Sequence, residues 1–243
     1  MTSSRPGRIW GLIAGQAASH GGRPSAADAC ATAAAAVEVT GAWLTAGSGV
    51  AASHLITVTD EVSERLAELQ VTLGEGPCPD ASASGGPALV SDLDEIEADR
   101  RWPTFAPAAR HAGAAAVFAF PLCIGAIPAG VMAMYRDRTG PMSTVQLGDA
   151  LILADTATLL LLDSQDQAGD PAAGAGPGGQ LAELTMHRAE IDQATGMLTE
   201  QLGVGITEAY ARLRAYAYAH DRRLNDLARD IVARRLRLDT DRC

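Results

Sequence analysis

One stretch near residue 170 divides this chain into two folding units. Residues 168–179 read AGDPAAGAGPGG, so that a single aspartate interrupts a run of alanine, glycine and proline. Glycine and proline at this density disfavour any regular helix or strand, and such a composition is typical of a linker. We therefore expect an N-terminal helix or tail over residues 1–24, a larger domain over 25–167, a linker over 168–180 and a small second domain over 181–243.

The larger domain has the hydrophobic periodicity of an α+β fold. Helical spacing covers residues 25–39, 60–70, 102–111 and 143–167, and short apolar segments typical of strands cover 41–46, 50–58, 88–91 and 114–135. Ser25 is placed to cap the first of these helices, with Asp28 three residues later. The glycines of Gly47-Ser48-Gly49 suit a tight hairpin. In contrast, LGEGPCPDA at residues 73–81 predicts no regular element. In the last helix, the leucine spacing predicts that Leu147, Leu151, Leu159 and Leu162 face the core.

Two apolar segments could be mistaken for a membrane span or an export signal. Residues 112–135 contain no charge, but Pro121, Pro128 and the turn at Gly125 favour two buried strands over a membrane span. The segment 9–18 has the spacing of a packed helix rather than of a signal peptide. We expect a cytoplasmic protein without a membrane anchor.

The cysteines and histidines give no sign of a metal or a cofactor. The four cysteines form no CxxC pair and have no histidine at ligand spacing, so neither a disulfide framework nor a zinc site is predicted. The acidic cluster at residues 92–99 lacks the glycine-spaced loop of a calcium site, and we expect a solvated loop there. The absence of lysine is typical of a GC-rich bacterial genome.

The second domain differs from the first in its charge. Helical spacing predicts three helices at residues 181–202, 207–220 and 223–236, the first ended by Gly203 and the second capped by Thr207. The chain has a net charge of −10, yet residues 205–237 hold eight arginines against four acids. A locally basic end on an acidic protein indicates a polyanionic partner.

Three sequence blocks in this region resemble the ANTAR domain, an RNA-binding module of bacterial transcription antiterminators. The blocks are Gln193-Ala194-Thr195-Gly196, Ala209 with Leu213-Arg214, and the run RLNDLA that begins at Arg223. Upstream, LGEGPC and PLCIGAIPAGVMAMY are similar to a GAF domain, an antiparallel-sheet sensor that often precedes ANTAR in actinobacterial proteins. The resemblance implies a GAF-like antiparallel sheet flanked by helices, followed by an all-α three-helix bundle. The ANTAR family commonly has lysine where this chain has Thr195.

The resemblance and the unpaired arginines together nominate an RNA-binding site. Guanidinium groups can fork onto phosphate and stack on bases splayed out of a loop. Within the sequence, Arg212, Arg214, Arg222 and Arg223 exceed the acids near them, whereas Arg188 with Asp192 and Arg234 with Asp230 have the spacing of helical ion pairs. We expect one of Tyr216 and Tyr218 at most to contact a base. The nominated residues are Arg188, Gln193, Thr195, Gly196, Arg212, Arg214, Tyr216, Arg222 and Arg223.

In the larger domain, a ligand pocket is expected around the GAF-like motif. Its nominated residues are Gly74, Glu75, Cys78, Phe118 and Phe120. Cys78 could be a redox-active thiol, but its sequence neighbours are acidic and would disfavour the thiolate. A structural cysteine is the favoured interpretation.

The function expected from these features is a signal-responsive antitermination regulator, not an enzyme, that binds stem-loops in leader transcripts. An unidentified small molecule is the expected signal. The heptad spacing of Leu184, Ile191 and Leu198 predicts a homodimer. Two alternatives remain open: a DNA-binding regulator of the helix-turn-helix type, and a thiol oxidoreductase that uses Cys78. A module whose helices only dimerise is a third possibility.

Overall fold

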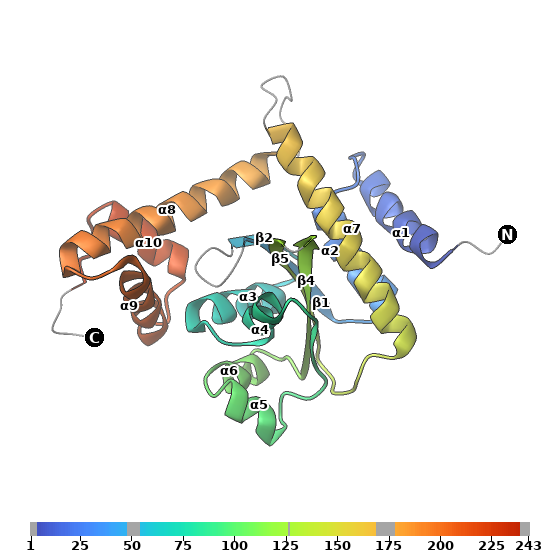
Figure 1. Ribbon diagram of the computed structural model, residues 1–243, viewed down its shortest axis with the longest axis horizontal. Coiled ribbons are helices and arrows are strands. Elements are labelled where there is room, and N and C mark those ends of the chain that lie inside the picture. Colours follow the sequence, from blue (N-terminus) through green and yellow to red (C-terminus); the bar gives the residue numbers. More distant parts are fainter. Residues whose placement is uncertain (1–3, 48–53, 126, 169–177, 239–243) are drawn as a thin grey trace.

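The N-terminal domain is built on a five-stranded antiparallel sheet with the strand order β2-β1-β5-β4-β3 (Figure 1). The computed structural model describes residues 4–47, 54–125, 127–168 and 178–238, with the side chains of 54, 165–168 and 178–188 excepted. The strands are β1 (Gly41–Ala46), β2 (His54–Val58), β3 (Ala88–Val90), β4 (Ala116–Ile124) and β5 (Ile127–Arg136). The predicted antiparallel sheet flanked by helices is therefore confirmed, and the charge-free residues 112–135 form the β4–β5 hairpin.

Helices cover both faces of this sheet. One face carries α1 (Arg5–Ser19), α2 (Ala26–Val37) and α7 (Thr144–Ala168), and the other carries α3 (Glu61–Leu73), α4 (Pro77–Ser84), α5 (Ile96–Arg101) and α6 (Phe105–His111). Side chains alternate between the two faces along each strand. In β4, Phe118 and Phe120 therefore join the core under α2 and α7, while Val117 and Ala119 join the core under α3 and α6.

Local capping accounts for several of these helix boundaries. Ser25 accepts a hydrogen bond from the Asp28 amide, and the Asp28 carboxylate accepts one from the Ser25 amide, which confirms the predicted N-cap and completes a capping box. Although burial raises the pKa of Asp28, hydrogen bonds from Ser25 and His20 bring it below its ordinary value. Gly74 ends α3 in the left-handed conformation, at φ 70°.

Three expectations for this domain were wrong. Helix α4 (Pro77–Ser84) begins within the segment predicted to be irregular, because Pro77 occupies the first turn, where proline fits a helix. Helix α5 forms in the acidic cluster that was expected to be a loop. In α7, Leu151 and Leu159 are exposed, and Leu153, Ala157 and Leu161 face the core instead.

The apolar character of α7 is sufficient, by length and composition alone, for a membrane span over residues 144–164. Its inner side packs against α2 and the sheet. The same composition is therefore explained by its place as a core helix. The predicted hairpin at Gly47-Ser48-Gly49 and most of the predicted linker lie outside the described residues.

The C-terminal helices are α8 (Gly178–Leu202), α9 (Ile206–Ala219) and α10 (Leu224–Val232), and they form a bundle beside α3 (Figure 1). The predicted three-helix bundle is thus confirmed, with α8 ending before Gly203 as expected. The N-cap of α9 is Gly205 rather than Thr207. Helix α10 ends at Val232, which is four residues earlier than predicted.

Candidate nucleic-acid interface

The bundle of α8, α9 and α10 encloses a small apolar core. Leu198, Leu213, Leu227 and Ile231 are fully or almost fully buried in it. The chain after α10 also belongs to the bundle, because Leu238 is buried and its carbonyl accepts a hydrogen bond from Gln201 Nε2 at 2.6 Å. These contacts fix the backbone from which the polar side chains project.

Helix α8 presents only part of the nominated Gln-Ala-Thr-Gly block. Gln193 is exposed, and Gly196 has open space where a side chain would be. Thr195, however, is 4% exposed, and its hydroxyl donates to the carbonyl of Ile191 at 2.7 Å. The nomination of Thr195 as an RNA contact is therefore wrong for this conformation, because its one hydrogen-bond donor is used inside the helix. The side chain of Arg188 lies outside the described residues.

The four arginines that were expected to exceed the nearby acids, Arg212, Arg214, Arg222 and Arg223, all have partners in the fold. Arg212 forms an ion pair with Glu208 one helical turn away, at 2.6 Å. Arg222 reaches Asp230 at 2.5 Å, and Arg235 approaches the other carboxylate oxygen of Asp230 at 2.7 Å. Hydrogen bonds from these two arginines lower the pKa of Asp230. The prediction that Arg212 and Arg222 are unpaired is therefore wrong.

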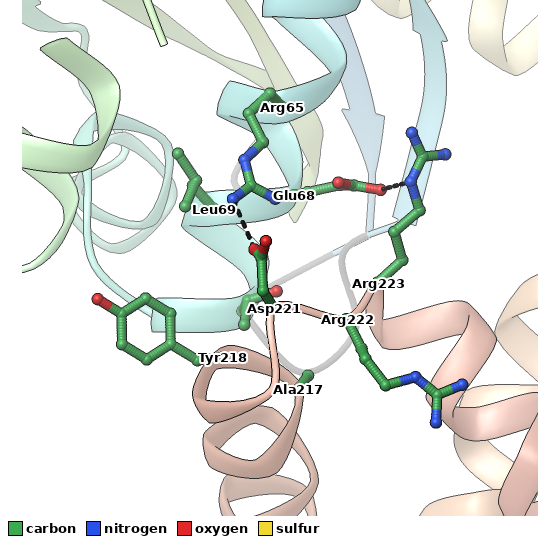
Figure 2. Close-up of a pocket in the computed structure, with 9 residues that line it drawn as sticks. Arg65, Glu68, Leu69, Ala217, Tyr218, Asp221, Arg222 and Arg223 are labelled. Atoms are coloured by element: carbon green, nitrogen blue, oxygen red, sulfur yellow. Dashed lines mark hydrogen bonds and ion pairs between the residues drawn. The ribbon is translucent and has the colours of Figure 1, made fainter. Parts of the chain in front are cut away.

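Arg223 finds its partners in the other domain. Its guanidinium lies 2.9 Å from Glu64 Oε1 and 3.3 Å from Glu68 Oε1, both on α3. Figure 2 shows Arg223 directed towards α3 and Arg222 turned away from it. Burial raises the pKa of Glu68, an effect that the charge of Arg223 opposes. The nearby carboxylates of Glu68 and Glu64 in turn raise the pKa of Arg223.

Arg214 also lies against α3, although it contacts no carboxylate there. Its Nη1 is 3.5 Å from the carbonyl oxygen of Val71, and its guanidinium lies over the Tyr210 ring, 5.3 Å from the centroid. Gly74, at the end of α3, leaves room for this guanidinium, since a Cβ at that position would collide with Arg214 Nη1. The sequence nominated Arg214 and Arg223 as RNA contacts, but the fold places both at the interface with α3.

The aromatic candidates differ in their surroundings. Tyr216 stacks on His220 with the ring centroids 3.9 Å apart, and it packs partly against the bundle core. Tyr218 is 50% exposed and borders the small cavity between α3 and α9 (Figure 2). Because the Tyr216 ring already stacks on His220, one of its faces is not available to stack on a base.

The fold adds two candidate arginines that the sequence did not nominate. No carboxylate lies within ion-pair distance of Arg234 or Arg237 in the part of the chain that the structure describes, and both are exposed. The predicted pair of Arg234 with Asp230 is wrong, because α10 ends at Val232 and Arg234 adopts the left-handed conformation at φ 58°. The surplus of arginine at the chain end was the one sequence signal for these residues.

The nominated sensor pocket is not a single site. Cys78 belongs to the core beneath α3 and α6, whereas Phe118 and Phe120 belong to the core on the opposite face of the sheet. Since the sheet lies between the two cores, these residues cannot line one cavity. Glu75 instead accepts a hydrogen bond from the Thr104 amide at 3.0 Å. Gly74 lies against Arg214 of the C-terminal bundle.

The surroundings of Cys78 are those of a structural cysteine. The residue is 8% exposed, and its amide donates to Gln70 Oε1 at 2.7 Å. Burial raises the pKa of its thiol to about 12, although contacts with Gln70 and Trp43 act in the opposite direction. At neutral pH such a thiol is almost entirely protonated, and a thiol is a weak nucleophile. In the described residues, histidine, cysteine and acidic side chains form no group of three that could hold a metal.

The family comparison gives a match for the C-terminal helices alone. Residues 179–232 match the family model of the ANTAR domain. No curated protein sequence matches the chain.

Among solved structures, the chain is similar to the GAF domain of a phosphoenolpyruvate-protein phosphotransferase from Coxiella burnetii, with 12% identity, a TM-score of 0.48 and coverage of 69% of this chain and 100% of the other. It is also similar to the GAF-B domain of DevS from Mycobacterium smegmatis, with 19% identity, a TM-score of 0.41 and coverage of 58% and 94%.

The family match begins one residue after the start of α8 and ends with α10. It therefore covers the three helices whose motifs the sequence contains. Residues 179–232 of this chain therefore match the ANTAR domain, and they follow a domain built on a five-stranded antiparallel sheet flanked by helices.

Proposed function

We propose that this protein is a cytoplasmic, signal-responsive regulator of transcription antitermination that binds stem-loops in nascent RNA through α8 to α10. The match of residues 179–232 to the ANTAR domain is the observation that carries this proposal. The presence of a sensor-like sheet domain before it supports regulation by a signal, for which an unidentified small molecule is the proposed source.

The charge distribution favours recognition by a few placed groups. Residues 181–243 hold ten arginines and ten acids, so the domain has no net charge to attract RNA over a distance. Exposed Gln193, Arg234 and Arg237 can donate hydrogen bonds to phosphates or to base edges. Arg214 and Arg223 can join them once they leave α3. In this mechanism the protein stabilises one RNA hairpin against a competing terminator, and no covalent chemistry is required.

We further propose that the active form is a homodimer, which would present two bundles to paired stem-loops. The heptad seam considered in the sequence is not available for pairing as it stands, since Leu198 is buried and Ile191 is partly buried within the bundle. Exposed apolar side chains occur instead on α1 and α7, where Trp10, Leu151 and Leu159 face solvent. Sedimentation that shows only monomer at micromolar concentration would remove this part of the proposal.

Binding to RNA and binding to DNA can be separated by one titration. The full chain is titrated with an RNA stem-loop and with duplex DNA at one fixed salt concentration, because the affinity for either polyanion changes steeply with salt. Tighter binding to the stem-loop supports the proposal, and tighter binding to the duplex favours a DNA-binding regulator. Crosslinking in the native cell followed by RNA sequencing then tests for enrichment of leader regions upstream of terminators.

A further inference from the structure

The contact between α3 and the ANTAR domain engages arginines on which the proposed RNA binding depends. Arg223 forms ion pairs with Glu64 and Glu68. Figure 2 shows the pair with Glu68 and the contact in which Arg65 donates to Asp221 at 3.1 Å. The first of these contacts pairs an ANTAR arginine with acids of α3, and the second pairs an ANTAR acid with an α3 arginine. The charges on the two surfaces are therefore complementary, and they orient the bundle on α3.

The interface is polar and incompletely satisfied, which is typical of contacts that can open. The pair of Arg65 with Asp221 is largely solvated, since the two side chains are 50% and 86% exposed, and such a pair is individually weak. The pairs of Arg223 are partly solvated, since Arg223 is 55% exposed while Glu64 and Glu68 are 32% and 24% exposed. Val71 packs against the bundle core only as a partly buried side chain. Arg214 Nε is buried without a hydrogen-bond partner among the described residues. An orphaned donor makes the docked state less stable than a fully paired interface would be.

We propose that the acidic face of α3, formed by Glu64 and Glu68, acts as an internal competitor of RNA for the ANTAR arginines. This inference rests on the proposed function. A guanidinium whose donors are held by carboxylates cannot at the same time fork onto phosphate oxygens. In the docked form Arg223 is held by carboxylates, and Arg214 is covered by the end of α3. RNA and α3 therefore compete for these two side chains.

This competition couples the sensor domain to RNA binding. If docking is favourable, the apparent affinity for RNA is reduced by the fraction of protein that is docked. Conversely, RNA that captures Arg223 releases α3, because coupling between two binding events is reciprocal. A signal that moves α3, or that alters its last turn at Gly74, shifts the same equilibrium. Helix α3 packs directly on β1 and α6, so it lies between the sheet and the ANTAR domain.

The test uses the full chain and an RNA of two adjacent stem-loops, selected on the wild-type protein from a pool with randomised loops. The Glu64→Gln, Glu68→Gln double variant removes the acidic partners and leaves every ANTAR residue unchanged. We expect its dissociation constant for this RNA to fall between about twofold and thirtyfold, as the loss of two partly exposed ion pairs predicts. We also expect its radius of gyration in small-angle X-ray scattering to increase without RNA.

A matched control removes the same charge elsewhere. Glu61 and Glu97 are exposed acids of the same domain, and neither contacts the ANTAR domain through an ion pair among the described residues. The Glu61→Gln, Glu97→Gln variant is expected to behave like the wild type in both measurements. An equal gain in RNA affinity from this control would show a general charge effect and overturn the competition.

Exchanging the charges tests docking without reference to RNA. Arg223→Glu is expected to open the chain by scattering, and the combination of Arg223→Glu with Glu64→Arg is expected to close it again. Equal RNA affinities of the wild type and the Glu64→Gln, Glu68→Gln variant would overturn the competition and leave the proposed function intact. If the selection yields no RNA that binds any variant, the proposed function fails, whatever the scattering shows.

Discussion

Replacement of Gly196 by alanine should change the stability of helix α8 and the affinity for RNA in opposite directions. Gly196 lies in the interior of α8 (Gly178–Leu202), and apart from the adjacent backbone of the helix itself no heavy atom lies within 4 Å of the position that a Cβ would take. Glycine is disfavoured in a helix interior by about 0.8–1.0 kcal/mol relative to alanine. Because the new methyl group meets nothing in the protein, Gly196→Ala should stabilise the bundle by about 0.5–1 kcal/mol.

Binding should change in the opposite direction if this open position receives the RNA backbone. A methyl group added to a close contact costs about 1–3 kcal/mol, which corresponds to a loss of RNA affinity of at least about fivefold. Urea denaturation followed by circular dichroism measures the stability, and a fluorescence titration with a stem-loop measures the affinity. With an m-value of about 1–2 kcal/mol/M, the midpoint should rise by a few tenths of a molar.

Two glycines of α1 provide matched controls. Gly11 and Gly15 also lie inside a helix, and at each of them a Cβ would have no heavy atom within 4 Å apart from the adjacent backbone of that helix. Alanine at either site should leave RNA affinity unchanged. A Gly196→Ala chain that is more stable and binds RNA as well as the wild type would refute the assignment of this position to the interface. A chain that is less stable would refute the helix argument itself.

Three further perturbations test other parts of the structure. Cys78 is buried and its thiol has a pKa of about 12, so iodoacetamide at pH 8 should label exposed Cys123 and leave Cys78 unmodified. Peptide mapping by mass spectrometry measures the labelling of each cysteine. Rapid labelling of Cys78 would support the alternative of a thiol enzyme. Because the pKa of Asp28 is lowered in the folded state, its stabilising contribution is present above its ordinary pKa of 3.8 and is lost as the pH falls below that value. Asp28→Asn should therefore destabilise the chain in urea at pH 7, with a difference that shrinks at pH 3, and a constant difference would contradict this linkage. Leu213 is fully buried, so Leu213→Ala should destabilise the bundle by about 2–5 kcal/mol and abolish RNA binding. A variant that keeps the helical circular dichroism of the wild type would contradict this prediction.

The features predicted well from the sequence are those decided by neighbouring residues. The Ser25–Asp28 cap forms as expected, and the glycine after Leu202 ends α8, because both depend on groups within one helical turn. The β4–β5 hairpin follows from an apolar run with a turn at its centre. In contrast, the density of proline and glycine around Pro77 predicts no helix, yet Pro77 begins one, since proline is excluded from the interior of a helix but fits its first turn.

The candidate sites were predicted less well because they depend on which face a side chain occupies. Phe118 and Cys78 were expected to line one pocket, yet the sheet separates them. Thr195 stands in a motif associated with RNA, yet its hydroxyl bonds to the preceding turn of its own helix. Charge counting could not reveal that Glu64 meets Arg223, because they are 159 positions apart in the chain.

The sequence alone determined that this chain has two parts, an α+β domain and a three-helix domain with ANTAR motifs, because composition and periodicity act over short distances. Only the tertiary structure decided which arginines are available. Packing of the bundle beside α3 places Arg214 and Arg223 at the domain interface, and it leaves Arg234 and Arg237 exposed. The availability of a charged group depends on every charge within a few ångströms of it, and these neighbours are fixed only when distant segments fold together.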